Sequence, residues 1–213
     1  CIGAAILHGF SENEDLIDQT RFQKFVDGTM AQFRQRAFLY EAALRGGVGL
    51  FQASNGVTPP EWKRYVDNLD LDRNYPGILG VGYILVVPNS ELPGFVRRIR
   101  SEGNPGFTYR KIDQNGIASP SVRLDTHFII TAIEPVSRNA PAVGLDIATE
   151  KNRYEGAMRA ARSGQPEVTR PIQLIQDFSK HAGFLLFLPI YREKKIFGWV
   201  YSPLTVDKFL GNV

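Results

Sequence analysis

Cysteine, histidine and long apolar runs are scarce in this chain of 213 residues. One cysteine, Cys1, excludes a disulfide framework within the chain and a metal site built from several thiolates. The three histidines, His8, His127 and His181, lie far apart in the sequence, so they do not indicate a zinc enzyme. No run approaches the roughly 18 consecutive apolar residues that span a bilayer. The sequence therefore predicts no membrane helix, no metal site and no cofactor.

The charge balance of the chain is nearly even. There are 25 lysines and arginines against 22 aspartates and glutamates, and this net charge of +3 is too small and too scattered for a nucleic-acid-binding protein. With 43% apolar and 22% charged residues, the composition is that of a soluble globular protein of one or two compact units. The chain begins without a methionine or a leader sequence, so we expect a segment of a longer protein.

Motifs of the common enzyme classes are also missing. Three glycines within 77–82 lie inside a strand-like pattern and do not lead into a helix, which argues against a phosphate-binding loop. No glycine-flanked serine elbow surrounds Ser119 or Ser121. We interpret His127 as a satisfied strand histidine. Four carboxylates lie at turns and strand ends, where such groups usually cap backbone N–H groups: Asp113, Asp125, Glu134 and Asp146. The sequence therefore predicts no catalytic residues.

The N-terminal part has the pattern of a long amphipathic helix. Ser11 and Glu14 have the spacing of a capping box, and apolar residues then recur every three or four positions as far as Phe51. We expect a stalk helix over 11–56, with a close contact or a bend at the glycines of 46–49. The apolar stripe is longer than one small domain needs, which predicts a parallel homodimer. A helix buried along its own domain remains an alternative.

A second helix is expected directly after the stalk. The first helix should end by Asn55 and Gly56, because glycine is common just past a helix end. Thr58 can then cap the next helix, whose first turn tolerates Pro59 and Pro60 because the N–H groups there have no helical partner.

The remainder alternates between strand and helix patterns. Strands are expected over 78–87, 107–112, 128–133, 168–175, 184–191 and 196–201, helices over 90–100 and 149–163, a loop over 135–141, a hairpin turn at Lys194 and Lys195, and a final helix after Thr205. This order predicts an α+β fold, in which a long N-terminal stalk helix (11–56) is followed by a PAS-like domain (57–213) with a central antiparallel sheet.

Several short motifs follow one another in a characteristic order. The motifs are Phe51-Gln52-Ala53-Ser54, the helix 61–66, Tyr75-Pro76-Gly77-Ile78, Val143-Gly144-Leu145-Asp146 leading to Asn152 and Arg153, Val168-Thr169-Arg170-Pro171, Pro189-Ile190-Tyr191 and Gly198-Trp199-Val200. Together, over most of residues 20–210, they resemble a CHASE domain.

The resemblance implies a sensor and not a catalyst. CHASE domains are extracellular or periplasmic ligand-sensing modules, held between two membrane helices of histidine kinases, diguanylate cyclases and similar receptors. Membrane tethering by flanking helices and a cytoplasmic kinase or cyclase output domain are therefore expected. The family fold is a stalk helix with two PAS-like lobes, and this chain ends about where the ligand-binding distal lobe finishes, so the proximal lobe is expected to be absent or reduced. A ligand-free structural or dimerisation module is the alternative.

The resemblance also indicates a ligand class. Plant cytokinin receptors of this family hold an adenine ring through an acidic side chain and a threonine, and these positions fall on Arg153 and Phe187 here. A guanidinium group only donates hydrogen bonds, so a cytokinin is not expected. Arg153 suits a carboxylate or phosphate group instead. The alternative that Arg153 points to solvent, or pairs with Glu150 or Glu155, stays open.

The expected pocket lies between the sheet and the helix 149–163. Its predicted lining is Tyr83, Leu85, Phe128, Ile130, Arg153, Thr169, Leu174 and Phe187. Thr169 matches a position near the family pocket, with an ordinary strand residue as the alternative. Strand alternation means that about half of the strand residues in this set face away from the pocket. If Arg153 supplies an anion contact, Arg153→Ala should weaken the binding of an acidic ligand and leave the folded stability nearly unchanged, because a mainly solvated arginine contributes little to folding.

The stalk helix generates a first prediction. Replacing both Phe25 and Phe33 with glutamate places like charges across the expected dimer seam, so the dimer should dissociate into monomers of half the mass. Light scattering measures this mass, and circular dichroism verifies that helix content is retained. A monomeric parent protein, or an unchanged mass in the variant, would contradict the dimer.

Overall fold

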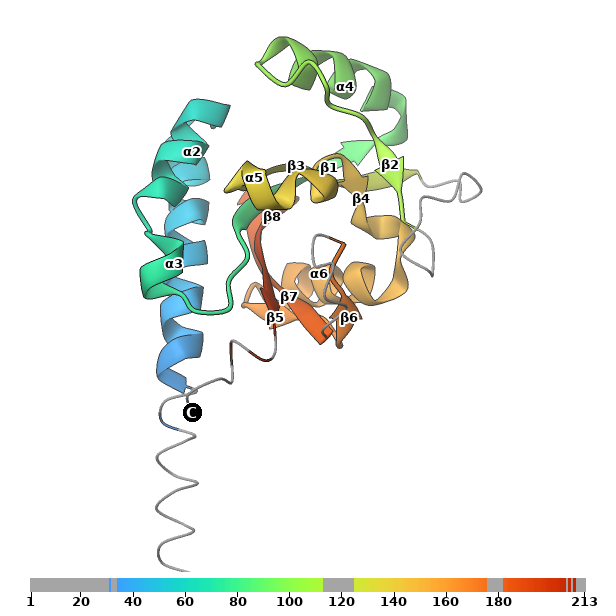
Figure 1. Cartoon of the computed structure of the whole chain (residues 1–213). Coiled ribbons are helices and arrows are strands. Elements are labelled where there is room, and N and C mark those ends of the chain that lie inside the picture. The colour runs from blue at the N-terminus through green and yellow to red at the C-terminus, as the bar shows by residue number, and fades with distance from the viewer. Residues whose placement is uncertain are drawn as a thin grey trace, which may run out of the picture. The chain divides into compact units, whose positions relative to one another are not determined.

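The computed structural model describes residues 31, 34–112, 125–175, 182–205, 207 and 209 (Figure 1). The chain divides into two compact units, which are Cys1–Leu39 with Asn212–Val213, and Tyr40–Gly211. The second unit contains the sheet and the helices that cover it. None of the helices in the described ranges is both long and apolar enough to cross a membrane.

The N-terminal helix covers residues 34–53. Its predicted start at Ser11, and the residues Phe25 and Phe33 of the dimer prediction, lie outside the described residues. From Tyr40 onward the apolar stripe is buried in the core of the second unit, at Tyr40, Leu44, Val48 and Phe51. This part of the stripe is therefore covered by its own domain, as the alternative to the dimer expected.

The helix α2 (Pro59–Asp67) begins as the sequence predicted. Thr58 and Glu61 form a capping box, in which the backbone N–H of Thr58 donates to Oε2 of Glu61 at 2.8 Å and the backbone N–H of Glu61 donates to Oγ1 of Thr58 at 3.4 Å. The α2 side chain Trp62 is fully buried and its Nε1 donates to the carbonyl oxygen of Val81 at 3.3 Å. This bond attaches α2 to the start of the first strand.

Close contacts explain the glycines of the N-terminal helix. A Cβ atom on Gly47 would lie 3.0 Å from the indole ring of Trp62 and 3.1 Å from Val200. A Cβ atom on Gly46 would lie 2.6 Å from the hydroxyl of Tyr65, which donates to the carbonyl of Ala43. The predicted close contact is thus confirmed, and it is made by the aromatic side chains of α2.

One sheet forms the centre of the second unit. Its strands are β1 (Val81–Pro88), β2 (Arg110–Lys111), β3 (Thr126–Glu134), β4 (Leu145–Asp146), β5 (Glu167–Val168), β6 (Ile172–Gln173), β7 (Ala182–Arg192) and β8 (Lys195–Thr205). The strand order is β2-β4-β3-β1-β8-β7-β5, and β6 also pairs with β7. All pairs are antiparallel except β2 with β4, so the sheet is mixed and not antiparallel throughout. In the sequence β3 comes after β2 and before β4. Because β4 runs antiparallel to β3, it has the same direction as β2, and these two strands pair in parallel.

Three sequence predictions need local corrections. The strand expected over 168–175 is divided into β5 and β6, because Pro171 between them has no N–H for a sheet hydrogen bond. The hairpin turn consists of Glu193 and Lys194, one residue earlier than predicted, and both have positive φ angles (49° and 63°), as a two-residue turn of this type requires. The loop expected over 135–141 contains short helical turns.

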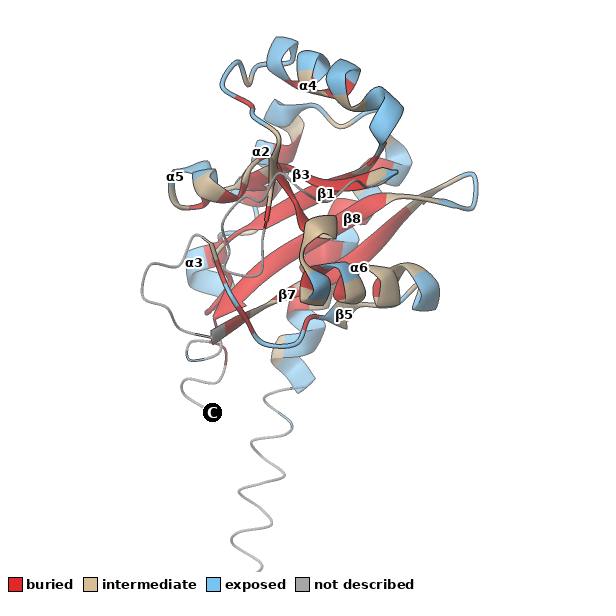
Figure 2. Cartoon of the chain, turned by 90° about the vertical axis from the view of Figure 1, so that its right-hand side faces the viewer, coloured by how far each residue is buried: buried red, intermediate tan, exposed pale blue. Residues whose placement is uncertain are grey.

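Helices cover the sheet on both faces (Figure 2). Besides the N-terminal helix and α2, the helices are α3 (Leu71–Asn74), α4 (Leu92–Ser101), α5 (Val136–Asn139) and α6 (Lys151–Ser163), with 3₁₀ turns at Asn89–Glu91, Ala140–Ala142 and Ile147–Thr149. The final helix predicted after Thr205 falls mostly outside the described residues. The N-terminal helix, α2 and α4 share one buried cluster with one face of the sheet, whereas α6 packs in a second cluster on the opposite face. The buried residues in Figure 2 follow the strands between these two helical layers.

The glycine contacts generate a matched pair of predictions. Gly47→Ala should destabilise the fold by about 1–3 kcal/mol, because the fully buried Trp62 and Val200 leave no space for the methyl group. Gly49→Ala should stabilise by up to about 1 kcal/mol, because nothing lies within 4 Å of the added Cβ and alanine favours the helix. Urea unfolding measures both. Equal effects of the two substitutions would show that the helix does not pack on Trp62.

Candidate functional site

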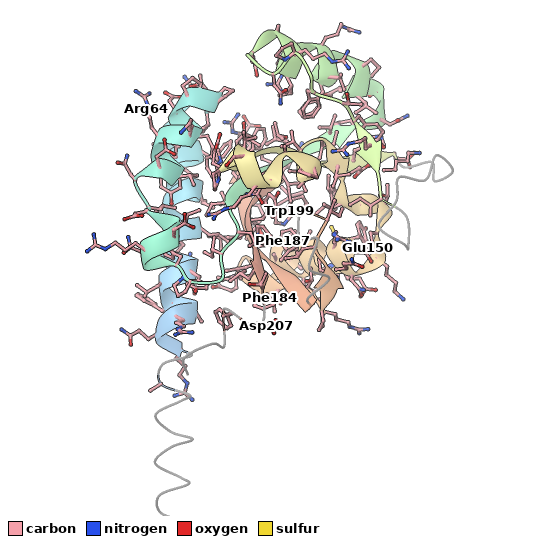
Figure 3. All side chains as sticks on the ribbon, in the orientation of Figure 1. Arg64, Glu150, Phe184, Phe187, Trp199 and Asp207 are labelled. Carbon is pink, nitrogen blue, oxygen red and sulfur yellow. The ribbon has the colours of Figure 1, made fainter. Side chains whose placement is uncertain are left out.

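The first turn of α6 carries the charged residue of the predicted pocket. Glu150 caps this helix, since its carboxylate accepts from the backbone N–H groups of Asn152 (3.0 Å) and Arg153 (3.1 Å). The Arg153 side chain turns back, and its Nη1 donates to Oε2 of Glu150 at 3.0 Å while its Nη2 donates to the carbonyl oxygen of Gln173 at 2.8 Å. Figure 3 labels Glu150 at this end of the helix.

Arg153 is therefore a buried residue, only 6% exposed. The expectation of a mainly solvated side chain is wrong, and the alternative of a pair with Glu150 is confirmed. Burial lowers the pKa of Arg153, and the carboxylate of Glu150 acts in the opposite direction. Because a guanidinium does not deprotonate in proteins, the group remains a cation. Removing its side chain would leave the half-buried carboxylate of Glu150 without its cationic partner, so Arg153→Ala is not a neutral probe of binding.

Tyr201 of β8 is an unsatisfied polar group beside Arg153. The side chain is 1% exposed, and its hydroxyl has no hydrogen-bond partner among the described residues. Burial raises the pKa of Tyr201, and the nearby charge of Arg153 lowers it. Tyr201, Arg153 and Leu174 line a cavity of about 10 Å³, which is space for at most one water molecule. The predicted pocket is thus closed in this structure.

The structure brings six of the eight predicted lining residues to the α6 side of the sheet. Phe128, Ile130, Leu174 and Phe187 belong to the core cluster on this face. Thr169 and Phe187 both pack against α6 at Gly156, because this glycine has no side chain that would keep them away from the helix. The Thr169 hydroxyl accepts from the backbone N–H of Leu185 at 3.0 Å, so it already has a structural partner. Phe187 and Trp199, labelled in Figure 3, belong to the neighbouring strands β7 and β8 and to the core cluster that includes α6.

Tyr83 and Leu85 need a correction, because they lie on the opposite face of the sheet. Both belong to the core cluster that contains the N-terminal helix and α4, while Ile84 between them faces α6. Strand alternation separates these neighbours. Tyr83 and Leu85 instead line a larger cavity of about 690 Å³ on their own face. No motif in the sequence predicts this cavity, and Tyr201 has the pattern of an ordinary core aromatic residue.

A buried polar network surrounds Asp146 at the far edge of the sheet. Oδ1 of Asp146 accepts from the backbone N–H groups of Phe128 (2.9 Å) and Ala148 (3.1 Å). Oδ2 lies 2.7 Å from Nδ1 of His127 and accepts from the hydroxyl of Tyr109 at 3.1 Å. The carboxylate therefore has four partners, which confirms its predicted role in capping backbone groups.

The same network accounts for His127. Its second ring nitrogen, Nε2, lies 3.0 Å from Oδ1 of Asn89, so both nitrogens of the ring have partners. Asp146 is 0% exposed and His127 is 2% exposed. A histidine–aspartate pair acts in catalysis only where it reaches a nucleophile or substrate, and this pair is enclosed by its own partners. The network is a structural link between β3, β4 and the turn that precedes α4.

Comparison with known proteins identifies one family. The family model described as CHASE domain matches residues 55–213. Among solved structures, the chain is similar to an extracellular ligand binding receptor from Desulfohalobium retbaense, with 12% sequence identity and a TM-score of 0.45. The similarity covers 83% of this chain and 25% of the receptor chain, so this chain spans about a quarter of the receptor's length. No curated protein matches the chain.

The Asp146 network generates a prediction. Asp146→Asn should destabilise the fold by about 3 kcal/mol, because the amide presents a donor to groups that themselves donate in a buried site. Asp72→Asn is the matched control, since Asp72 is an 80% exposed partner of Arg138 and its loss should cost less than about 1 kcal/mol. Thermal unfolding compares the two. Equal losses would show that the buried network contributes no more than a surface ion pair.

Proposed function

Because this chain belongs to the CHASE domain family, we propose that it is the ligand-binding domain of a transmembrane signalling receptor. As a CHASE domain it is an extracellular sensor domain and not a catalytic one. The finer proposal is that flanking helices tether it to the membrane, and that ligand binding regulates a cytoplasmic histidine kinase or diguanylate cyclase. The part of the helix before residue 40 is proposed to pair with a second copy of the chain.

The arrangement of the second unit supports a PAS-like lobe over 57–213. Five strands are antiparallel neighbours in the order β3-β1-β8-β7-β5. The helix α6 covers one face of this part of the sheet, and the N-terminal helix with α2 covers the other. Small-molecule sites are lined mainly by apolar side chains with a few polar groups, and the residues beneath α6 have this composition. We propose the α6 face as the ligand site.

The unsatisfied hydroxyl of Tyr201 is the observation that carries this site. A buried polar group without a partner costs about 1–3 kcal/mol, and proteins contain few of them. Tyr201 and the buried cation Arg153 line the same small cavity. A small acidic molecule would accept hydrogen bonds from both groups, and Phe187, whose ring is stacked on Tyr201 at 6.3 Å between centroids, would provide an apolar wall. Entry requires the side chains around the cavity to separate.

The closed cavity favours one alternative, a ligand-free structural module. A volume of about 10 Å³ holds no metabolite, and Arg153 already has Glu150 and Gln173 as partners. In this alternative the domain transmits a signal through its helix without a small molecule, and Tyr201 is a minor packing defect.

A matched pair of tyrosine variants distinguishes the two functions. Thermal-shift screening against small carboxylates and cell extracts should find a ligand that stabilises the parent protein, by about 2.7 kcal/mol at 100 times its dissociation constant. Tyr201→Phe should unfold at the same or a higher temperature than the parent protein but lose most of this response, because it removes only the unpaired hydroxyl.

Tyr191→Phe is the control. Its hydroxyl donates to the carbonyl of Ala161 at 2.7 Å, so its loss should cost about 1 kcal/mol of stability and leave the ligand response intact. The absence of any stabilising ligand would support the structural module. An unchanged response in Tyr201→Phe would place the ligand elsewhere.

A further inference from the structure

A cavity lies on the face of the sheet away from α6. It has a volume of about 690 Å³ and lies among the end of the N-terminal helix, the start of α2, the strand β1 and the helix α4. This volume is within the range of about 300–1,000 Å³ that small-molecule sites occupy. A neighbouring cavity of about 530 Å³ along α4 shares Leu85, Arg98 and Phe197 with it.

Aromatic and aliphatic side chains form most of the cavity wall. Phe51 and Phe197 come from the N-terminal helix and β8, and Leu85 and Ile99 come from β1 and α4. The rings of Phe51 and Tyr83 meet edge to face, with centroids 5.0 Å apart. Such walls favour a planar, apolar ligand body, because aromatic rings pack well against one another in these geometries.

Tyr83 provides a hydrogen-bond donor inside this cavity. The side chain is 4% exposed, and its hydroxyl makes no hydrogen bond within the described ranges. Burial raises the pKa of Tyr83 to about 12, with a further increase from Glu102 and a decrease from Arg98, so the hydroxyl keeps its proton at neutral pH. Two other residues of the cavity wall carry hydroxyls, and both already donate: Thr131 to the carbonyl of Ile129 at 3.0 Å, and Thr58 to Oε2 of Glu61 at 2.7 Å.

Arg192 provides a cation at the cavity rim. Its guanidinium lies 4.0 Å above the ring of Phe197, and its Nη2 donates to the carbonyl of Asn55 at 3.2 Å. No acidic side chain among the described residues forms an ion pair with it. Arg98, in contrast, is paired with Glu102 at 3.3 Å. The stacked ring and the carbonyl fix the plane of the Arg192 fork, and its remaining N–H groups are free to bind a carboxylate.

The charges on the wall limit the ligand to one negative charge. Arg98, Arg192 and Glu102 line the cavity, which leaves one net positive charge. Glu102 would repel a second negative charge on the ligand, so a phosphate dianion is disfavoured.

From these observations we propose that this cavity is a second ligand site, for a planar aromatic monocarboxylate with a hydrogen-bond acceptor on its ring. The carboxylate binds Arg192, the ring lies between Phe51, Leu85 and Phe197, and the ring acceptor receives the Tyr83 hydroxyl proton. The proposal does not depend on the α6 site, because the sheet separates the two cavities.

Calorimetry with matched probes tests the proposal. The probes are para-coumarate, which has the carboxylate and a ring hydroxyl, cinnamate, which lacks the hydroxyl, and para-coumaramide, which lacks the charge. The parent protein should bind para-coumarate with one-to-one stoichiometry and more tightly than either analogue. Weak binding without saturation, or equal affinity for the acid and the amide, would overturn the site.

Variants assign the two contacts. Arg192→Gln should weaken para-coumarate binding about tenfold, which is about 1.4 kcal/mol, and leave para-coumaramide binding unchanged. Arg192→Lys should recover part of the loss because it keeps the charge. Tyr83→Phe should weaken para-coumarate but not cinnamate. Melting temperatures of all variants verify that they fold.

Two controls make the result specific. Arg64→Gln removes an exposed charge of α2 outside the cavity (Figure 3) and should not change binding. Tyr201→Phe alters only the α6 face and should also bind para-coumarate normally. An equal loss in Arg64→Gln and Arg192→Gln would reduce the effect to general electrostatics and contradict the proposal. A loss in Tyr201→Phe would move the binding to the α6 face.

Discussion

The central strands β1 and β8 are buried on both faces, and this double burial governs the rest of the second unit. Most residues of β8 from Gly198 to Thr205 are buried, and β1 is buried over nearly its whole length. Strands of this kind must be covered by apolar side chains from two helical layers, because burial of apolar area is the main favourable contribution to folding. The N-terminal helix and α2 provide one layer and α6 provides the other. Trp199 of β8 is an example of such a contact, because its indole Nε1 donates to the carbonyl of Ala157 in α6 at 2.9 Å.

The two faces of the sheet differ in where their buried polar groups lie. Beneath α6 the charge of Arg153 is balanced by Glu150, and the Tyr201 hydroxyl has no hydrogen-bond partner among the described residues. On the other face the polar groups are gathered around an open cavity, where Tyr83 and Arg192 keep donors that no described residue accepts. The first face is a filled interior, and the second contains a preformed space. A small displacement of β1 or β8 would move side chains on both faces of the sheet, because each strand contributes alternate side chains to the two faces.

Local patterns predicted much of this architecture from the sequence. The Thr58 cap of α2, the helix α6 and the presence of the paired strands β7 and β8 follow from spacing and turn residues alone. The faces of the sheet were harder to assign. In β1, Tyr83, Ile84 and Leu85 are all apolar and all buried, so no polar residue marks the outer face. The burial of Arg153 also escaped prediction, because it depends on the carbonyl of Gln173, twenty positions along the chain.

The glycine contact of the N-terminal helix has a mechanical consequence. The ring of Trp62 lies in the notch left by Gly47, and Trp62 is in turn bonded to the carbonyl of Val81. Because the Trp62 ring occupies the space where Gly47 has no side chain, the residues on either side of Gly47 block translation of the N-terminal helix along its own axis relative to α2. From Tyr40 to its end, the N-terminal helix is therefore held in a fixed position against α2 and β1. A displacement of the N-terminal helix along its axis would therefore have to move α2 by the same amount. Bending or rotation of the helix about Gly47 would meet less resistance.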